Sequence, residues 1–195
     1  MSTRIKANNF IFLILGLLIT TTGCQMSEKI TDKSAGLNGG FEVFQNGLPV
    51  NWLMYTSKTV PNSDFKIILD KSVFKEGQQS LKFEVKKCTG KAAWRSPGFT
   101  NEFFEVDKFM GEATYRISFW IKNSGTKFRI TTACVKAMTG DDSLKKIIEE
   151  NTEIVNWKYM EIDINIPKDY WLKMELSILE PGTFWIDDIK IDKIE

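Results

Sequence analysis

Histidine is absent from this sequence of 195 residues. Its absence excludes Ser-His-Asp triads, histidine general bases and histidine-ligated zinc sites. Pairs of carboxylates remain possible, and the nearest in sequence are Glu161 with Asp163 and Glu102 with Glu105. Hydrolysis by two carboxyl groups requires a cleft and a raised pKa on one of them, and nothing in the sequence marks these four as more than surface charge. We therefore expect that the protein is not an enzyme.

The sequence also lacks an excess of either charge. It contains 26 basic and 25 acidic residues, a formal net charge of +1. Arg4 and Lys6 are the charged residues before residue 24, so the rest of the chain carries 24 basic and 25 acidic side chains, a net charge of −1. A balanced surface of this kind offers no electropositive footprint, so nucleic acid is not an expected partner.

The clearest apolar run, Phe10 to Ile19, is short. It is too short for an ordinary transmembrane helix and has the length of a signal-peptide core. The residues TTTGC follow at 20–24. Small residues followed by Gly-Cys resemble the lipobox of bacterial lipoproteins, which implies a signal peptide at 1–23 and a lipid anchor on Cys24. The alternative is an ordinary signal peptide with Cys24 unmodified, or an uncleaved anchor.

A lipidated Cys24 would place the protein on a bacterial membrane, at the outer membrane, the cell surface or in the periplasm. Residues 25–36 are polar and lack apolar periodicity, so we expect 24–36 to be a flexible tether and 37–195 to be the folded domain.

Cysteine is scarce, with three in the chain. Cys24 is assigned to the anchor, which leaves Cys88 and Cys134. In an oxidising compartment two such cysteines can form a disulfide. Two separate buried thiols are the equal alternative, because sequence contains no distance between them.

From Leu37 onward the chain alternates between apolar and polar residues with period two, as in strands that bury one face. A typical run is Tyr115 to Lys122, and turn residues separate this run from the others. The pattern predicts an all-β fold, a jelly-roll β-sandwich of two antiparallel sheets. Residues 143–150 are the exception, since their pattern also suits a short helix or an extended loop.

Five motifs occur in a characteristic order along residues 37–195. They are LNGGFE at 37–42 with GLP and NW close behind, EGQQSL at 76–81, YRISFWIK at 115–122, WKYM at 157–160 and GTFWIDDIKI at 182–191. Together they resemble carbohydrate-binding module families 4, 9 and 22, which are galactose-binding-like jelly rolls. The resemblance covers essentially the whole of 37–195 and implies the sandwich fold together with a polysaccharide or oligosaccharide ligand.

The same resemblance implies a structural calcium ion where the first and last strands meet. Calcium takes six to eight oxygen ligands from carboxylates and backbone carbonyls. We carry the site over to Glu42 and Asp187, with a backbone oxygen from Gly40 or a neighbour, and with Asp188 in place of Asp187 if the register differs. The alternative is that these carboxylates are solvated or cap turns.

Aromatic residues make up 12% of the chain, and most must be core. The apolar rows predict a set of buried rings, namely Phe41, Phe83, Tyr115, Phe119 and Phe128. The resemblance implies that Trp52 and Trp157 also lie in the core. Sugar-binding modules need exposed rings and polar partners for hydroxyl groups. Trp94 lies between small and basic residues, whereas Trp171 and Trp120 lie on polar rows. We expect these three to contact a ligand, with candidate polar partners Arg95, Arg116, Arg129 and Glu175; the alternative is that loops cover the rings.

We therefore predict a non-catalytic, glycan-binding lipoprotein module that holds polysaccharide at the bacterial cell envelope. Partner glycoside hydrolases or other envelope proteins would act beside it. The alternative function is that of a structural or protein-binding envelope lipoprotein, which would use the same fold without affinity for sugar.

Overall fold

The structure is a computed structural model that describes residues 30–101, 112–136, 139–140 and 142–194. The predicted signal peptide, Cys24, Glu102 and Glu105 lie outside the described residues. Within the described part of the chain, no helix is long and apolar enough to cross a bilayer. Lipidation of Cys24 therefore stays a prediction from the sequence.

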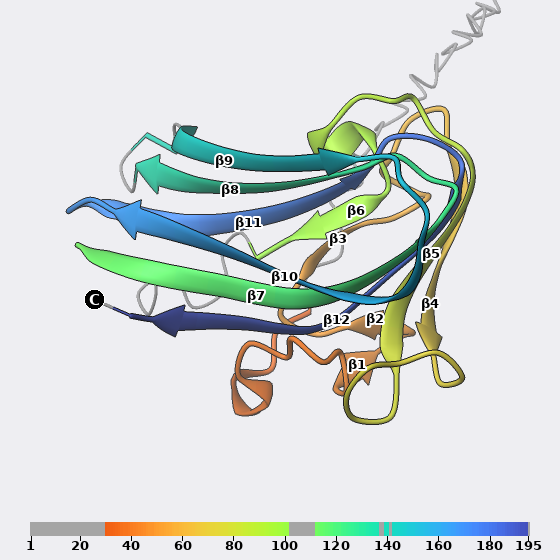
Figure 1. Ribbon diagram of the computed structural model, residues 1–195, viewed down its shortest axis with the longest axis horizontal. Coiled ribbons are helices and arrows are strands. Elements are labelled where there is room, and N and C mark those ends of the chain that lie inside the picture. The colour runs from red at the N-terminus through yellow and green to blue at the C-terminus, as the bar shows by residue number, and fades with distance from the viewer. Residues whose placement is uncertain (1–29, 102–111, 137–138, 141, 195) are drawn as a thin grey trace, which may run out of the picture.

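In the described residues, two five-stranded antiparallel sheets stack face to face (Figure 1). One sheet, here the β7 sheet, has the order β10 (Ile154–Ile166), β7 (Ala113–Ser124), β12 (Gly182–Lys193), β5 (Ser80–Lys87) and β4 (Asp64–Asp70). The other, the β11 sheet, has the order β3 (Leu53–Tyr55), β6 (Gly98–Thr100), β11 (Tyr170–Ile178), β8 (Phe128–Lys136) and β9 (Asp142–Glu150). The all-β jelly-roll sandwich predicted from the alternation is confirmed.

Four short elements lie outside the two five-stranded sheets. Strands β1 (Phe44–Gln45) and β2 (Leu48–Pro49) form a small hairpin, and the 3₁₀ helices η1 (Lys33–Ala35) and η2 (Ala93–Arg95) lie in connections. The chain passes between the sheets from β7 to β8 and from β11 to β12, so β12 ends the chain in the middle of the β7 sheet, between β7 and β5. This placement brings the last strand beside segments from early in the sequence.

The core lies between the inner faces of the sheets. The five rings expected there are buried, with exposed fractions of 0–4% that include Phe41, Phe83 and Phe119 at 0%. Trp52 is also fully buried, and its ring meets that of Phe99 edge-on at 4.9 Å between centroids. Each such ring contributes roughly 2–3 kcal/mol by leaving water. Trp157 differs from the prediction, because it is half-buried on β10.

Residues 30–36 belong to the folded domain, where we expected part of a flexible tether. The side chain of Asn51 is 1% exposed and bonds this segment at three points. Its Oδ1 accepts from the Asp32 N–H at 2.7 Å, and its Nδ2 donates to the carbonyls of Asp32 and Gly36 at 2.7 and 2.8 Å. A buried amide satisfied by backbone groups holds the segment in place, so the folded domain includes residues 30–36.

Residues 143–150 form most of strand β9, rather than the helix or loop left open by the sequence. The strand pairs with β8, and Ile148 lies opposite Ile130. Glu149 accepts from Lys127 at 2.7 Å and from Arg129 at 2.5 Å, both from the neighbouring strand or the turn before it. Cross-strand pairing and these ion pairs, which a local pattern does not contain, favour the extended conformation here.

Candidate functional site

The first and last segments of the domain meet, as the calcium prediction requires. The Ile189 N–H donates to the Gly39 carbonyl at 3.0 Å. A β-carbon on Gly39 would lie 1.8 Å from the Ile189 carbonyl oxygen, so only glycine permits this approach. An irregularity in the pairing of β12 with β7 between Asp187 and Lys190, with φ of 50° at Asp188, turns the chain at this point. The two ends of the domain are therefore joined backbone to backbone beside the predicted carboxylates.

Glu42 and Asp187 reach the same turn, at residues 75–78. Asp187 is fully buried, and its Oδ2 accepts from the N–H groups of Lys75 and Glu76 at 2.7 and 3.1 Å. The exposed Glu42 accepts the Gln78 N–H at 2.8 Å through Oε1. Burial raises the pKa of Asp187, although the N–H groups that it accepts act in the opposite direction. The carboxylates thus cap one turn from two sides, which is the turn-capping alternative left open by the sequence.

The corner fits a hard cation in the type of its ligands. Two carboxylates converge there, and Gly40 lies two residues before Glu42 with its backbone half-buried. Within the described ranges, no group of three or more acidic or cysteine side chains is placed to hold a metal. Calcium would therefore need backbone carbonyls for most of its six to eight oxygens. Asp188, the substitute ligand, instead bonds Lys190 at 2.7 Å.

A polar surface covers the outer side of the β11 sheet, and we call it the β11 face. It consists of the outward-pointing side chains of β11 and their cross-strand neighbours, which include Tyr55, Thr131, Ile147, Trp171, Lys173, Glu175 and Ser177. These side chains point outward because the alternate residues of β11, from Leu172 to Ile178, are fully buried in the core. The β11 face thus follows the polar row that the sequence predicted.

Glu175 is the centre of a hydrogen-bonded network on this face. It is 7% exposed, and its Oε1 accepts from the Tyr55 hydroxyl at 3.1 Å. Lys173 lies 3.5 Å from Glu175 Oε2 and 2.8 Å from a carboxylate oxygen of Asp142. Fixed carboxylate, ammonium and phenol groups of this kind are suited to bonding sugar hydroxyls. Tyr55 did not emerge from the sequence, because its strand has three residues and shows no clear alternation.

Trp171 lies on the predicted row, at the far end of β11 from η2, but it is only 6% exposed. It therefore offers no open ring face in this structure, which is the alternative that the sequence left open.

Trp94 is 59% exposed. The other five tryptophans also lie in the described residues, and all of them are buried or half-buried. Arg95 lies 5.5 Å from the Trp94 ring centroid. Trp94 and Arg95 are thus adjacent and accessible, as predicted.

The loop that carries Trp94 is fastened to the β11 face. The Ala93 N–H donates to the Ser177 hydroxyl at 3.0 Å, and Thr89 donates to the Arg95 carbonyl at 2.8 Å. The Ser96 hydroxyl also bonds the Lys91 carbonyl. These bonds hold the indole beside one end of the β11 face, so an exposed aromatic ring and a fixed polar network share one side of the molecule.

Trp120 and Arg116 lie on the opposite side, on the outer face of the β7 sheet. Trp120 is half-buried, with the Tyr159 ring 5.2 Å away and Lys75 Nζ 4.2 Å above it. Arg116 donates twice to Asp163, at 2.8 Å each. The structure therefore separates the predicted ligand-binding residues into two groups, Trp94 with Arg95 and Trp171 on one face and Trp120 with Arg116 on the other.

The carboxylates Glu161 and Asp163 do not have the environment of an acid–base pair. The Arg116 guanidinium lowers the pKa of Asp163 through hydrogen bonds, while partial burial opposes this effect. Glu161 lies 4.0 Å from the same guanidinium and accepts from the Tyr159 hydroxyl at 3.3 Å. A general acid needs a raised pKa at neutral pH, so this pair has the properties of surface charge.

The structure does not pair Cys88 with Cys134, and both thiols are free. Cys134 lies opposite Leu172 in the ladder between β8 and β11. Cys88 lies near Glu180, beyond the other end of β11, and that charge helps burial to raise the pKa of its thiol. Leu172 marks the position of Cys134, and Leu179, next to Glu180, marks that of Cys88. The two leucines are seven residues apart along extended chain, about 20 Å. A disulfide requires Cα atoms within about 7 Å. Of the two alternatives that the sequence left open, this structure has the separate thiols.

Comparison with solved structures shows that the sandwich is a known carbohydrate-binding-module fold. A chain of Clostridium thermocellum endo-1,4-β-D-xylanase 10B, with its family 22 module and catalytic module in complex with xylohexaose, matches with a TM-score of 0.55 and 17% identity. The match covers 80% of this protein and 28% of that chain.

Two isolated modules match almost over their full length. The family 22 xylan-binding domain from Paenibacillus barcinonensis Xyn10C has a TM-score of 0.54 and 14% identity, covering 80% of this protein and 92% of the domain. A family 4 carbohydrate-binding module has a TM-score of 0.55 and 13% identity, covering 80% and 98%. No protein-family model and no curated protein sequence matches the chain. The protein therefore has the jelly-roll fold of these modules, as the sequence motifs predicted.

Proposed function

We propose that the protein is a non-catalytic glycan-binding module whose ligand lies across the β11 face and against Trp94. The observation that carries this proposal is the position of Trp94. It is the most exposed tryptophan of the chain, and its loop is bonded to the end of the face where Ser177 lies. An aromatic ring stacks on the apolar C–H face of a sugar ring, while fixed polar groups bond the hydroxyls.

The rest of the β11 face supports an extended ligand. Lys173 presents an ammonium group held by Asp142 and Glu175, and the nearly buried Glu175 is itself bonded by Tyr55. Ile147 on the edge strand β9 is 55% exposed and adds apolar surface. The fold is also that of modules that bind xylan, which makes neutral plant polysaccharides the first ligands to test. The function proposed for this face is binding of the glycan without hydrolysis.

Affinity electrophoresis through gels that contain xylan, other soluble plant glycans or bacterial polysaccharides tests this function. We expect retardation of the wild-type protein by at least one glycan, and a loss of affinity of about tenfold or more for Trp94→Ala. Tyr159→Ala is the matched control, because Tyr159 is 47% exposed on the other sheet and its removal should leave binding unchanged. Absence of binding to every glycan would refute the proposal and favour the protein-binding alternative.

We further propose that the corner of Glu42 and Asp187 binds a structural calcium ion. The two carboxylates would supply ligands and the neighbouring backbone, including Gly40, would supply carbonyl oxygens. A bound cation would also offset the cost of burying the Asp187 charge, which the raised pKa reflects. Calcium would then hold together the first segment, the turn at 75–78 and β12.

Calorimetry and thermal unfolding of EDTA-treated protein test the calcium site. Calcium at a hundred times its Kd should raise Tm by roughly 5 °C or more. Asp187→Asn should abolish this rise, whereas Asp192→Asn, at an exposed position on the same strand, should retain it. Equal melting temperatures with calcium and with EDTA would contradict the assignment.

Finally, we propose that a lipid on Cys24 tethers the module to the bacterial envelope, as the signal-peptide pattern implies. Several acyl chains, at about 0.8 kcal/mol for each buried methylene, hold a domain firmly on a bilayer. Intact-mass measurement of the protein extracted from membranes is the test. A mature chain that begins elsewhere, or that carries no lipid, would rule the tether out.

A further inference from the structure

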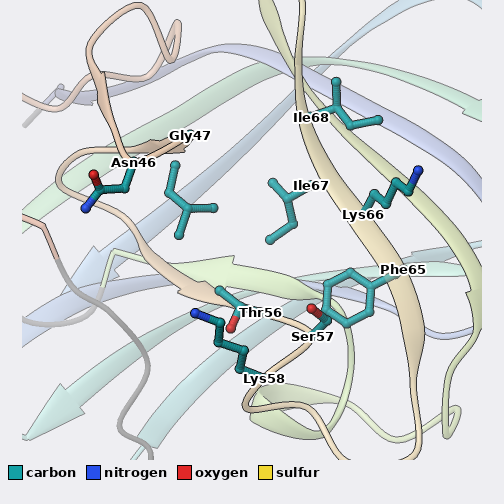
Figure 2. A pocket seen from close by; sticks show the side chains of 10 residues that line it. Asn46, Gly47, Thr56, Ser57, Lys58, Phe65, Lys66, Ile67 and Ile68 are labelled. Carbon is teal, nitrogen blue, oxygen red and sulfur yellow. The ribbon is translucent and has the colours of Figure 1, made fainter.

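A groove lies between the edge of the β7 sheet and the segment that follows strand β3. It has a volume of about 470 Å³ and is lined by the β1–β2 turn, the segment after β3 and residues 65–68 of β4. Figure 2 shows Asn46 across the hollow from Ile67 and Ile68, with Thr56 and Lys58 at one end. A groove of this size accommodates several residues of an extended chain.

One wall of the groove is the free edge of a sheet. Strand β4 is the outermost strand and pairs with β5 alone, with Ile67 opposite Phe83. Within the described residues, the backbone of 65–68 makes no hydrogen bond on its other side. An unpaired strand edge presents a row of N–H and C=O groups, which is a template for another extended segment.

The lining of the groove suits a peptide better than a sugar. Leu48 and Ile67 are half-buried and supply an apolar floor. Phe65 is the aromatic residue of the lining, and at 6% exposed it offers no ring face for stacking. The side chains of an extended peptide alternate, so that every second one would enter such a floor.

The charge of the groove specifies the occupant further. Lys58 and Lys66 line it, are exposed, and form no ion pair with any described residue. Glu84, which lies opposite Lys66 on β5, is instead bonded to Lys82 at 2.6 Å. Two unneutralised ammonium groups beside an apolar floor favour an occupant that carries carboxylates.

The walls are held in place before any ligand binds. Asn46 and Gly47 have positive φ angles of 53° and 77°, which is the geometry of a tight hairpin turn. At the other end, Thr59 N–H and Val60 N–H both donate to the Thr56 carbonyl, at 3.0 and 2.9 Å. A preformed groove reduces the entropic cost of binding.

We propose that this groove binds an extended acidic segment of a partner protein, which adds to β4 as an outer strand. Its alternate apolar side chains lie on Leu48 and Ile67, and its carboxylates face Lys58 and Lys66. The module would then hold a protein at this edge while the β11 face remains free, so this inference does not depend on the proposed glycan site.

Fluorescence anisotropy with two labelled hexapeptides tests the proposal. One peptide alternates Glu with Val, and the other alternates Lys with Val. We expect the acidic peptide to bind the wild-type protein and to bind the double variant Lys58→Glu/Lys66→Glu about tenfold more weakly or worse. The same variant should bind the basic peptide more tightly than the wild type does. Lys86→Glu, at an exposed position on β5, is the matched control and should bind as the wild type does.

The site is located by backbone NMR shifts, which should change at residues 65–68 on addition of the acidic peptide. Three outcomes would overturn the proposal. These are absence of binding by the acidic peptide, equal binding to wild type and to Lys58→Glu/Lys66→Glu, and shifts confined to the β11 face. If the acidic peptide does not bind and oligogalacturonate instead shifts the signals of residues 65–68, the groove is an acidic-glycan site.

Discussion

Asp70, at the end of β4, offers a quantitative test of how the carboxylates hold this sandwich. The residue is 8% exposed. Its Oδ1 accepts from the Ser72 hydroxyl at 2.6 Å, the Ser72 N–H at 2.9 Å and the Val73 N–H at 3.2 Å. Its Oδ2 accepts from the indole N–H of Trp185 on β12 at 3.0 Å. Asp70→Asn keeps the shape of the side chain but removes its charge. It also replaces one accepting oxygen with an NH₂ group, which then faces N–H or O–H donors.

The size of the effect follows from the pKa of this carboxyl. Burial opposes ionisation of Asp70, but the bonds from Ser72, Trp185 and Val73 outweigh burial and lower the pKa from 3.8 to about 2. Because the folded-state pKa is depressed, the ionised form is stabilised by roughly 2 kcal/mol at neutral pH. This stabilisation is fully present above about pH 5 and is lost as the pH falls toward 2.

Urea unfolding of the wild type and Asp70→Asn across this pH range is the appropriate assay. The difference in unfolding free energy should be about 2 kcal/mol at pH 7, roughly half of that at pH 3, and only about a few tenths of a kcal/mol at pH 2. Asp64→Asn, at an exposed position on the same strand whose side chain bonds no other described residue, is the control and should cost little at any pH. A difference that does not change with pH would refute the electrostatic reasoning.

Three further perturbations test the packing of the domain. Gly39→Ala should lower the unfolding free energy by about 3 kcal/mol in urea titrations, because the new β-carbon would overlap the Ile189 carbonyl; a neutral effect would contradict that contact. Asn51→Ala should cost about 2 kcal/mol and expose the segment before residue 37 to proteolysis; unchanged protection would show that other contacts hold it. Iodoacetamide followed by peptide mass spectrometry should label half-buried Cys88 faster than buried Cys134, whereas recovery of a linked peptide pair would contradict the free thiols.

The sequence predicted the strands and the core well, because both follow from the alternation of side chains. The row of Ile117 and Phe119 faces the core at 0% exposure, as period two requires. The sequence could not predict that Trp171 is buried and that Trp120 lies on the other sheet. Alternation assigns a residue to one face of its strand, but it does not reveal which sheet the strand joins or what covers that face. It also left β9 open, because the strand depends on cross-strand partners in β8 rather than on its own pattern.

The corner where the two ends of the domain meet is held by hydrogen bonds as well as offering ligands for a metal. One loop, residues 71–79, is held by three carboxylates that come from different parts of the sequence. Asp70 caps its beginning, Asp187 accepts the N–H groups of Lys75 and Glu76, and Glu42 accepts the N–H of Gln78. Because all three are acceptors for backbone donors, they orient the loop with or without a cation. Glu42 and Asp187, the two predicted metal ligands, therefore have a structural role in the fold itself. A calcium ion would strengthen a corner that hydrogen bonds already define.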